Sequence, residues 1–123
     1  MNMRDKRVFK KILKYCSEIP KTHQIFHEDR DLFFDTENGF VYRNAIAMPI
    51  LQIGELSKAL TPEMRQSRSD IPWHDIVGMR DIAVHHYGAL DYDKIWDASH
   101  ADVQALAKEV RLILEEDEKE AAQ

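Results

Sequence analysis

Apolar side chains recur at three- and four-residue steps along most of this chain. That spacing places them on one face of an α-helix, whereas a half-buried strand would alternate at every second residue. The pattern predicts helices over residues 4–19, 41–56, 76–84, 92–96 and 103–114. Residues 21–34 carry a weaker pattern, which fits either a helix or a short helix followed by a loop. We therefore predict an all-α, up-and-down bundle of about five helices.

Prolines and capping residues set the expected helix boundaries. Pro20 is expected to end the first helix, because proline removes a backbone donor and clashes with the preceding turn. Residues 35–39 have the composition of a turn, and Thr61 precedes Pro62 in the order typical of a helix start. Pro49 lies inside the long helix over residues 41–56, where it predicts a kink rather than a second start.

Glycine and charge refine the second half of the pattern. Gly54 is expected to allow a close helix contact, and Gly88 to stop the helix that carries residues 76–84. Asp91 is placed to cap the next helix, and a break is expected near residues 99–100. The tail over residues 115–123 is acidic, and negative charge at a helix C-terminus opposes the helix dipole. We expect that tail to fray.

Composition narrows the possible protein classes. The 123 residues are enough for one domain but not two, so a multidomain enzyme is excluded. Four glycines and four prolines are too few for the turns of an all-β protein. The longest apolar run, residues 45–51, is far shorter than a membrane-spanning helix, and no secretory signal is evident.

Cysteine and charge point to the compartment and the partners. Cys16 is the only cysteine, so it can form neither an intrachain disulfide nor a cysteine-rich zinc site, which fits a reducing cytoplasm. The net charge of −5 argues against a protein that coats nucleic acid nonspecifically. A local basic site remains compatible with that charge.

One polar segment is difficult to explain by folding alone, because it lies on a helix that is apolar nearly all round. It comprises Arg80, Asp81, His85, His86 and Tyr87. Arg80 stays protonated, and burying its charge unpaired is costly, so it must reach a carboxylate, a cleft or an anion. Asp81 precedes His85 by four residues, so its carboxylate can hold the imidazole tautomer. These residues fit catalysis, and they also fit a satisfied polar core or a dimer contact.

Arg80 and His85 do not lie on one helix face. A helix turns by about 100° per residue, so five residues leave the two side chains about 140° apart around its axis. Two arrangements would bring them together. Either the helix ends near His85, or a second copy of the chain places its own pair across a two-fold axis. The second arrangement makes a homodimer a condition of function.

Arg80, His85 and Tyr87 match the R-x-x-x-x-H-x-Y signature, and the chain around them resembles the HEPN-domain family. The similarity is to the HepT-like toxin ribonucleases, which are paired with minimal nucleotidyltransferase antitoxins. It rests on the order and spacing of four segments: Ile53-Gly54-Glu55-Leu56-Ser57-Lys58, the run from Ile71 to Asp81, His85-His86-Tyr87, and Asp91-Tyr92-Asp93-Lys94-Ile95-Trp96. The short signature alone occurs by chance, whereas the ordered combination is much more specific.

The resemblance implies a homodimeric helical bundle that cuts RNA, such as tRNA, without metal or another cofactor. Arg80 and His85 would be the catalytic residues of a toxin ribonuclease. The matching tyrosine of the family is adenylylated by the antitoxin, so Tyr87 would be the modified or RNA-positioning residue. The added adenylate would bring bulk and negative charge into the cleft and inactivate the toxin.

One residue departs from the family pattern. Asn commonly follows the motif arginine, and this chain has Asp81. A carboxylate there could stabilise an imidazolium, or it could neutralise Arg80 and repel phosphate. Glu55 could face the motif and pair with Arg80, or it could be a simple surface carboxylate. His86 is assigned a supporting role with Asp81 and Glu55.

Other candidates carry weaker signals. His23 and His27 are four residues apart, with Glu28 adjacent, but a third metal ligand is not evident, so we predict no metal site. His74 and His100 are interpreted as structural or exposed. Trp73 and Trp96 are expected to anchor the core. No glycine loop that could cradle a phosphate is present.

The sequence therefore predicts a single HEPN-like domain over residues 1–123 that acts as a metal-independent endoribonuclease toxin. The alternative is a noncatalytic interaction or nucleotide-binding module, in which the nucleotidyltransferase partner carries the chemistry. Asp81 and the negative net charge favour that alternative.

Overall fold

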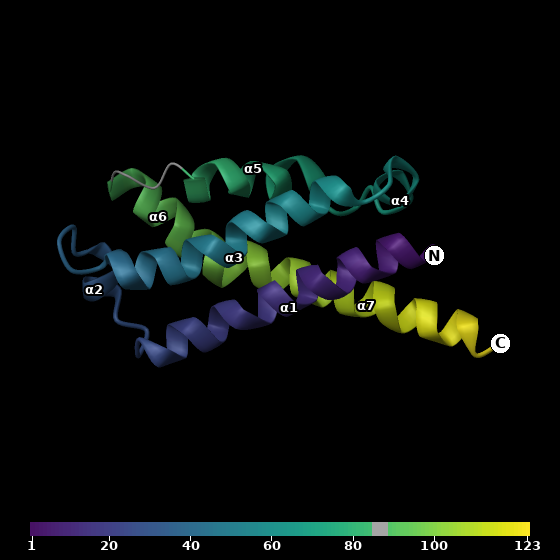
Figure 1. Cartoon of the computed structure of the whole chain (residues 1–123), viewed down its shortest axis with the longest axis horizontal. Helices are drawn as coiled ribbons and strands as arrows, with labels where there is room; N and C mark the ends of the chain where they lie inside the picture. Colours follow the sequence, from purple (N-terminus) through teal and green to yellow (C-terminus); the bar gives the residue numbers. More distant parts are fainter. Residues whose placement is uncertain (85–88) are drawn as a thin grey trace.

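The computed structural model describes residues 1–84 and 89–123, and all regular structure in them is helical (Figure 1). The all-α prediction is confirmed for these residues. The elements in chain order are α1 (Met3–Ile25), α2 (Arg30–Phe34), α3 (Phe40–Ala59), α4 (Pro62–Ser67), α5 (Trp73–Val84), α6 (Ala89–Asp97), the π-helical η1 (Ala98–Asp102) and α7 (Val103–Ala121). The four long helices α1, α3, α5 and α7 form the body of the bundle, and the short elements connect them.

Helix α1 continues past Pro20 to Ile25, so the prediction that Pro20 ends it is wrong. Proline removes only one backbone donor, and the ring of Pro20 lies on the exposed side of the helix. Ile19, one residue before the proline, and His23, three residues after it, are both fully buried. Burial on both sides of the proline keeps the helix intact, because packing of an apolar face supplies most helix stability in proteins.

The segment between α1 and α3 forms a short helix followed by a turn. The sequence had not decided between this arrangement and a single longer helix. The Asp29 carboxylate caps α2 by accepting from the Leu32 amide, and the Asp35 carboxylate accepts from the amides of the following turn. Arg43, a buried residue of α3, donates from Nη1 to the carbonyls of Phe33 and Asp35, each at 2.7 Å. This guanidinium ties the segment to the bundle.

Helix α3 lies at the centre of the bundle and packs against both α1 and α5 (Figure 1). It is one helix through Pro49, as predicted, and its buried side chains include Ile46, Ile50 and Ile53. Trp73 and Trp96 both pack against the core, which confirms their predicted role as anchors. The predicted cap of α4 is also present, because the Thr61 hydroxyl accepts from the Met64 amide.

The C-terminal third departs from two expectations. Helix α6 already begins at Ala89, so Asp91 lies within the helix rather than at its cap. The break expected near residues 99–100 is the π-helical η1, which leads directly into α7. Gly88, the predicted helix stop, lies outside the described residues.

The acidic tail stays helical as far as Ala121, contrary to the expectation that it frays. The N-terminus and the C-terminal end of α7 lie at the same end of the bundle (Figure 1). Asp117 pairs there with Lys6 Nζ at 3.0 Å and with the N-terminal amine at 3.5 Å. These cations offset the unfavourable charge of the tail.

Two properties of the described residues bear on the excluded protein classes. None of their helices combines the length and the apolar character needed to cross a bilayer.

Cys16 is fully buried, and this burial raises the pKa of its thiol to about 12. The thiol therefore stays protonated at neutral pH, which suits a core residue rather than a nucleophile.

We expect Lys6→Gln to weaken the tail in a pH-dependent way. The hydrogen bond from Lys6 lowers the pKa of Asp117 below its ordinary 3.8, so folding favours the ionised carboxylate. The contribution to stability is then present above the ordinary pKa and is lost as pH falls through the lowered value. An NMR titration of the Asp117 carboxyl should show its midpoint rising in Lys6→Gln, while Glu118→Gln leaves it unchanged. An equal midpoint in wild type and Lys6→Gln would contradict the pairing.

Candidate functional site

The position of Arg80 is set by a close approach of α3 and α5 at Gly54. A Cβ atom added at Gly54 would lie 2.8 Å from the Arg80 Cβ and 3.3 Å from its backbone nitrogen. No side chain larger than hydrogen fits there without a shift, because real Cβ contacts are longer. The prediction that Gly54 permits close helix contact is confirmed, and its neighbour across the contact is the motif arginine.

Glu55 and Asp81 both contact the Arg80 guanidinium. Arg80 Nε forms an ion pair with Glu55 Oε1, and Nη1 donates to Asp81 Oδ1 at 3.3 Å. The side chains of Arg80, Glu55 and Asp81 are 40%, 43% and 72% exposed. Of the two interpretations of Glu55, the structure shows the one in which it pairs with Arg80.

This arrangement keeps the Arg80 side chain 40% exposed, although its Nε atom is itself buried. Ion pairs at such exposure contribute only about 0–1 kcal/mol each, because water screens both partners. A phosphate can therefore replace either carboxylate at small cost, and it offers the bidentate geometry that a guanidinium prefers. The two carboxylates partly neutralise Arg80, which is one of the two effects considered for Asp81 from the sequence.

The other motif residues, His85, His86 and Tyr87, directly follow α5 and lie outside the described residues. Their predicted roles stay predictions. So does the expected interaction between Asp81 and His85, whereas the contact of Asp81 with Arg80 is described.

We expect Gly54→Ala to destabilise the protein by about 1 kcal/mol, because the strain of overpacking exceeds the gain in helix propensity. Gly78→Ala is the matched control, since it also lies inside a helix but a Cβ there meets nothing within 4 Å. It should gain roughly 0.5–1 kcal/mol from propensity alone. Urea unfolding of both variants measures the difference. Equal stabilisation by both substitutions would contradict the close contact at Arg80.

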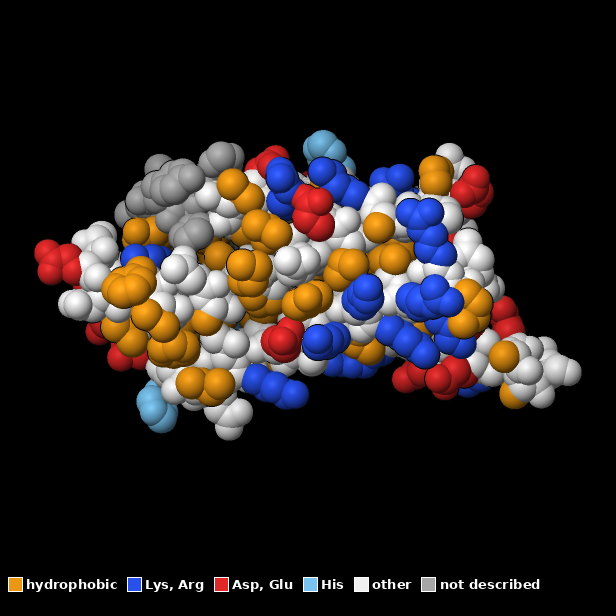
Figure 2. Space-filling model, viewed as in Figure 1, with side chains coloured by type: hydrophobic (Ala, Val, Ile, Leu, Met, Phe, Trp, Pro, Cys, Tyr) orange, Lys and Arg blue, Asp and Glu red, His pale blue; other side chains and the backbone are white. Residues whose placement is uncertain are grey.

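Charge is distributed very unevenly around this site. Helix α1 holds seven of the seventeen Lys and Arg residues but only two of the twenty-two Asp and Glu residues. Arg4, Arg7, Lys11 and Lys14 follow one another at helical spacing, and all four are exposed. Figure 2 shows Lys and Arg side chains gathered along α1, on the face of the molecule that also displays α3. The local basic surface that the net charge left open is therefore present.

The same view shows apolar side chains exposed along α3 (Figure 2). Phe40, Val41 and Met48 are each more than half exposed. Val41 and Met48 are seven residues apart, and Glu55 follows after another seven, so the three lie along one side of the helix. The exposed apolar residues of α3 therefore lie on the same side of the helix as Glu55, the partner of Arg80.

A groove of about 520 Å³ lies between α5 and α7. Its floor includes Ile76, Met79 and Leu106, and carboxylates stand around it. The acidic members of the lining are Asp70, Asp75, Asp102 and Glu109. These carboxylates would repel a polyanion, so the groove is a poor site for a phosphate-bearing ligand. His74, interpreted from the sequence as structural or exposed, is exposed and belongs to this lining.

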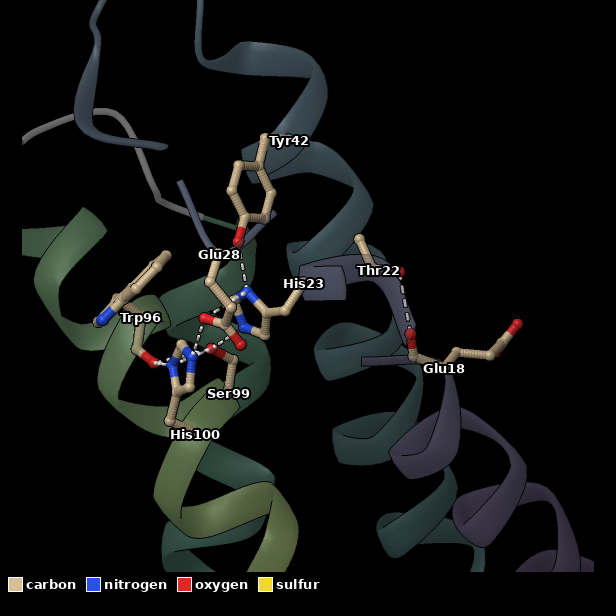
Figure 3. Close-up of polar contacts among 8 residues, drawn as sticks. All are labelled: Glu18, Thr22, His23, Glu28, Tyr42, Trp96, Ser99 and His100. Atoms are coloured by element: carbon tan, nitrogen blue, oxygen red, sulfur yellow. Dashed lines mark hydrogen bonds and ion pairs between the residues drawn. The ribbon is translucent and has the colours of Figure 1, made fainter. Parts of the chain in front are cut away.

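A second polar cluster, around the buried His23, was not predicted as a unit (Figure 3). The His23 side chain is 1% exposed and lies among Tyr42, Ser99 and His100. Glu28 reaches the cluster from the turn after α1. The sequence signal was the spacing of His23 and His27 with Glu28 adjacent. His100 is 72 positions from Glu28, and only the fold brings these two residues together.

The hydrogen bonds fix the tautomer of His23. The Ser99 hydroxyl donates to the Trp96 carbonyl at 2.7 Å, so it must accept from His23 Nε2 at 2.8 Å. Nε2 then carries the proton, and Nδ1 accepts from the Tyr42 hydroxyl. Burial, together with the nearby His100, lowers the pKa of His23 to about 4, so the ring is neutral at pH 7.

Three side chains of this cluster have the chemistry of metal ligands. His23, Glu28 and His100 offer ligand atoms within 4.8 Å of one another. His27, the other histidine considered from the sequence, is not part of this group. The described residues thus contain the third ligand that the sequence did not reveal.

Comparison with known proteins gives one consistent result. A family model described as "Ribonuclease HepT-like" matches residues 9–113. "Putative RNase MJ1380" of Methanocaldococcus jannaschii is 32% identical over 76 residues, covering 62% of this chain and 70% of that protein. "Putative RNase TTE0752" of Caldanaerobacter subterraneus subsp. tengcongensis is 38% identical over 65 residues, covering 53% of this chain and 58% of that protein.

A third relative carries the family name itself. "Probable ribonuclease HepT" of Thermococcus cleftensis is 28% identical over 85 residues, covering 69% of this chain and 72% of that protein. No solved structure matches this chain.

Proposed function

Because this chain belongs to the ribonuclease HepT-like family, we propose that it is a metal-independent endoribonuclease whose site is built around Arg80 and His85. The observation that carries the proposal is the guanidinium of the family motif, held at the surface by exposed carboxylates that a phosphate can replace. The proposed substrate is RNA, with tRNA as the class suggested by family resemblance.

The chemistry needs a proton acceptor, a proton donor and a cation. A ribose 2′-hydroxyl loses its proton to a base, and its oxygen attacks the adjacent phosphorus. The bond from phosphorus to the 5′-oxygen then breaks, and that oxygen takes up a proton. Products are a 2′,3′-cyclic phosphate and a 5′-hydroxyl. His85 is the proposed acid or base, and Arg80 stabilises the charge on the phosphorane oxygens.

Helix α1 provides a surface on which RNA can lie. Its exposed cations, Arg4, Arg7, Lys11 and Lys14, have no ion-pair partner among the described residues, in contrast to Lys6. Each cation that contacts a phosphate releases a condensed counterion, which drives association even though the whole chain is acidic. The basic surface of α1 and the outer side of α3 face the same direction (Figure 2).

We propose that the exposed apolar side of α3 is covered by a second copy of the chain. An exposed apolar strip is costly in water, and a two-fold axis near it would bring two copies of the Arg80 pair towards each other. A homodimer of this kind supplies the cleft that the helical spacing of Arg80 and His85 in the sequence predicts.

The regulatory part of the proposal rests on family resemblance. A nucleotidyltransferase antitoxin would adenylylate Tyr87 and thereby place negative charge where the RNA phosphate must bind. The protein would then be the toxin of a toxin–antitoxin pair.

Arg80→Ala and His85→Ala should each abolish cleavage of labelled tRNA in the presence of a chelator, with helix content and dimer mass unchanged. Removing the guanidinium or the imidazole removes transition-state stabilisation worth at least about 100-fold in rate. Arg30→Ala is the matched control, since Arg30 also forms an exposed ion pair, with Asp93 at 3.4 Å. The measurement is the yield of cyclic-phosphate ends.

The alternative, a noncatalytic module that works with a nucleotidyltransferase, is distinguished by the same experiment. Intact RNA with the wild-type dimer would support the module and reject the enzyme. Cleavage by Arg80→Ala at the wild-type rate would reject the assigned site while leaving an RNase activity to be located elsewhere.

Replacing Arg7, Lys11 and Lys14 by Gln should weaken RNA binding and flatten its dependence on salt. Each lost phosphate contact reduces the slope of log K against log salt by about 0.7 for single-stranded RNA, so the triple variant should lose roughly 2. Fluorescence anisotropy at several salt concentrations measures the slope. Arg80→Ala is present in every protein compared, so that the RNA stays intact.

A matched triple variant controls for the change in net charge. Lys94, Lys108 and Lys119 lie outside α1, and all are exposed. Their replacement by Gln should leave the salt slope unchanged. Equal slopes for both triple variants would show that RNA does not follow α1.

A further inference from the structure

We propose that His23, Glu28 and His100 form a binding site for one divalent transition-metal ion such as Zn²⁺. The site joins the C-terminal end of α1 to η1, on elements other than those that hold Arg80 (Figure 3). It is independent of the proposed ribonuclease chemistry, which needs no metal.

The donor set and its spacing suit such an ion. Two imidazole nitrogens and a carboxylate oxygen are ligands that zinc accepts, with a fourth position left for water. His100 Nε2 lies 2.8 Å from Glu28 Oε2, and His23 Nδ1 lies 3.9 Å from the same oxygen. Ligands of one zinc ion at about 2.0–2.2 Å are roughly 3.3 Å apart in a tetrahedron. The observed separations bracket that value, and the exposed Glu28 and His100 side chains are able to adjust.

Two departures from regular backbone place these ligands. His27 and Glu28 both have left-handed conformations, with φ of 57° and 52°, which are uncommon for residues other than glycine. Ser99 and His100 lie in the π-helical η1 between α6 and α7. Short π-helical segments and strained residues are concentrated at functional sites. Here, both irregular segments converge on the same buried histidine.

The hydrogen bonds of His100 direct its Nε2 atom at Glu28. His100 Nδ1 lies 2.8 Å from the Trp96 carbonyl, which only accepts, so Nδ1 carries a proton. Nε2 then faces the Glu28 carboxylate 2.8 Å away. A metal ion that replaces the proton shared by this pair would also have His23 Nδ1 within reach, 3.9 Å from the same carboxylate oxygen.

His23 is prepared as a ligand by its surroundings. Its Nε2–H donates to Ser99, which fixes the ring orientation and leaves the lone pair on Nδ1, as is typical of metal-binding histidines. The competing group is the Tyr42 hydroxyl, which donates to Nδ1 and must turn away when a metal binds.

The test is a zinc titration of the untagged full-length protein after removal of metals with a chelator. Calorimetry should show one equivalent of Zn²⁺ per chain, and zinc should raise the melting temperature. Glu28→Gln and His100→Ala should each weaken the affinity at least about tenfold, because each removes a ligand. Both residues are exposed, so these variants are expected to fold, which far-UV circular dichroism checks. Cobalt supplies a second readout, since tetrahedral Co²⁺ gives visible absorbance bands that both variants should lose.

Two further variants distinguish a metal site from a purely structural hydrogen-bond cluster. His27→Ala removes the neighbouring exposed histidine and should leave zinc affinity unchanged. Tyr42→Phe removes the donor that competes at His23 Nδ1, so zinc should bind at least as tightly and raise the melting temperature more than in wild type. Absence of binding by wild type, or equal binding by wild type, Glu28→Gln and His100→Ala, would overturn the proposal. RNA cleavage enters none of these measurements, so failure of the ribonuclease assignment would remain distinguishable.

Discussion

The contact between α3 and α5 at Gly54 is the constraint on which the candidate ribonuclease site depends. With no side chain at residue 54, the two helices approach until the Arg80 backbone lies against α3. The guanidinium then emerges beside Glu55, the next residue of α3. A larger residue at position 54 would separate the helices, and the motif arginine would lose the carboxylate that orients it. Thus, a packing requirement within the bundle sets the position of a group whose proposed role is at the surface.

The uneven charge would allow an acidic protein to bind an anionic polymer, as the proposed function requires. Four cations of α1, Arg4, Arg7, Lys11 and Lys14, lie on one exposed side, whereas the groove between α5 and α7 is lined by carboxylates. Because charges more than about 10 Å apart are largely screened at physiological salt, local charge governs where a phosphate can bind. The acidic groove and tail would then keep RNA away from other surfaces. This distribution is compatible with a ribonuclease whose substrate approaches from one side only.

The His23 cluster shows how polar groups can be part of the core of a small helical domain. Tyr42, His23, Ser99 and the Trp96 carbonyl form a continuous chain of hydrogen bonds in which each donor and acceptor has a defined role. Such networks are favourable only when every buried member is satisfied. The exposed pair of Glu28 and His100 closes the chain towards solvent. The cluster therefore connects the end of α1 to η1. Hydrogen bonds are directional, so they fix the relative orientation of these two segments more closely than apolar contacts alone would.

The sequence by itself determined the elements and the family. Apolar periodicity located the long helices because burial of one face dominates helix formation, and the ordered segments around Arg80 and His85 indicated a HepT-like chain, as the family match confirms. The sequence did not determine where α1 ends. Proline usually ends a helix, but that rule takes no account of the burial of Ile19 before Pro20 and His23 after it.

Only the tertiary structure decided which side chains meet. Whether Glu55 pairs with Arg80 depends on the distance between two helices, and that distance depends on the packing at Gly54. Glu28 and His100 are 72 positions apart and carry no shared local pattern. Their meeting follows from the left-handed turn after α1 and from the π-helical segment before α7, both of which are set by long-range packing. The apolar periodicity of a segment shows which of its side chains are buried. A site depends instead on which segments pack together, and that is decided by the tertiary structure.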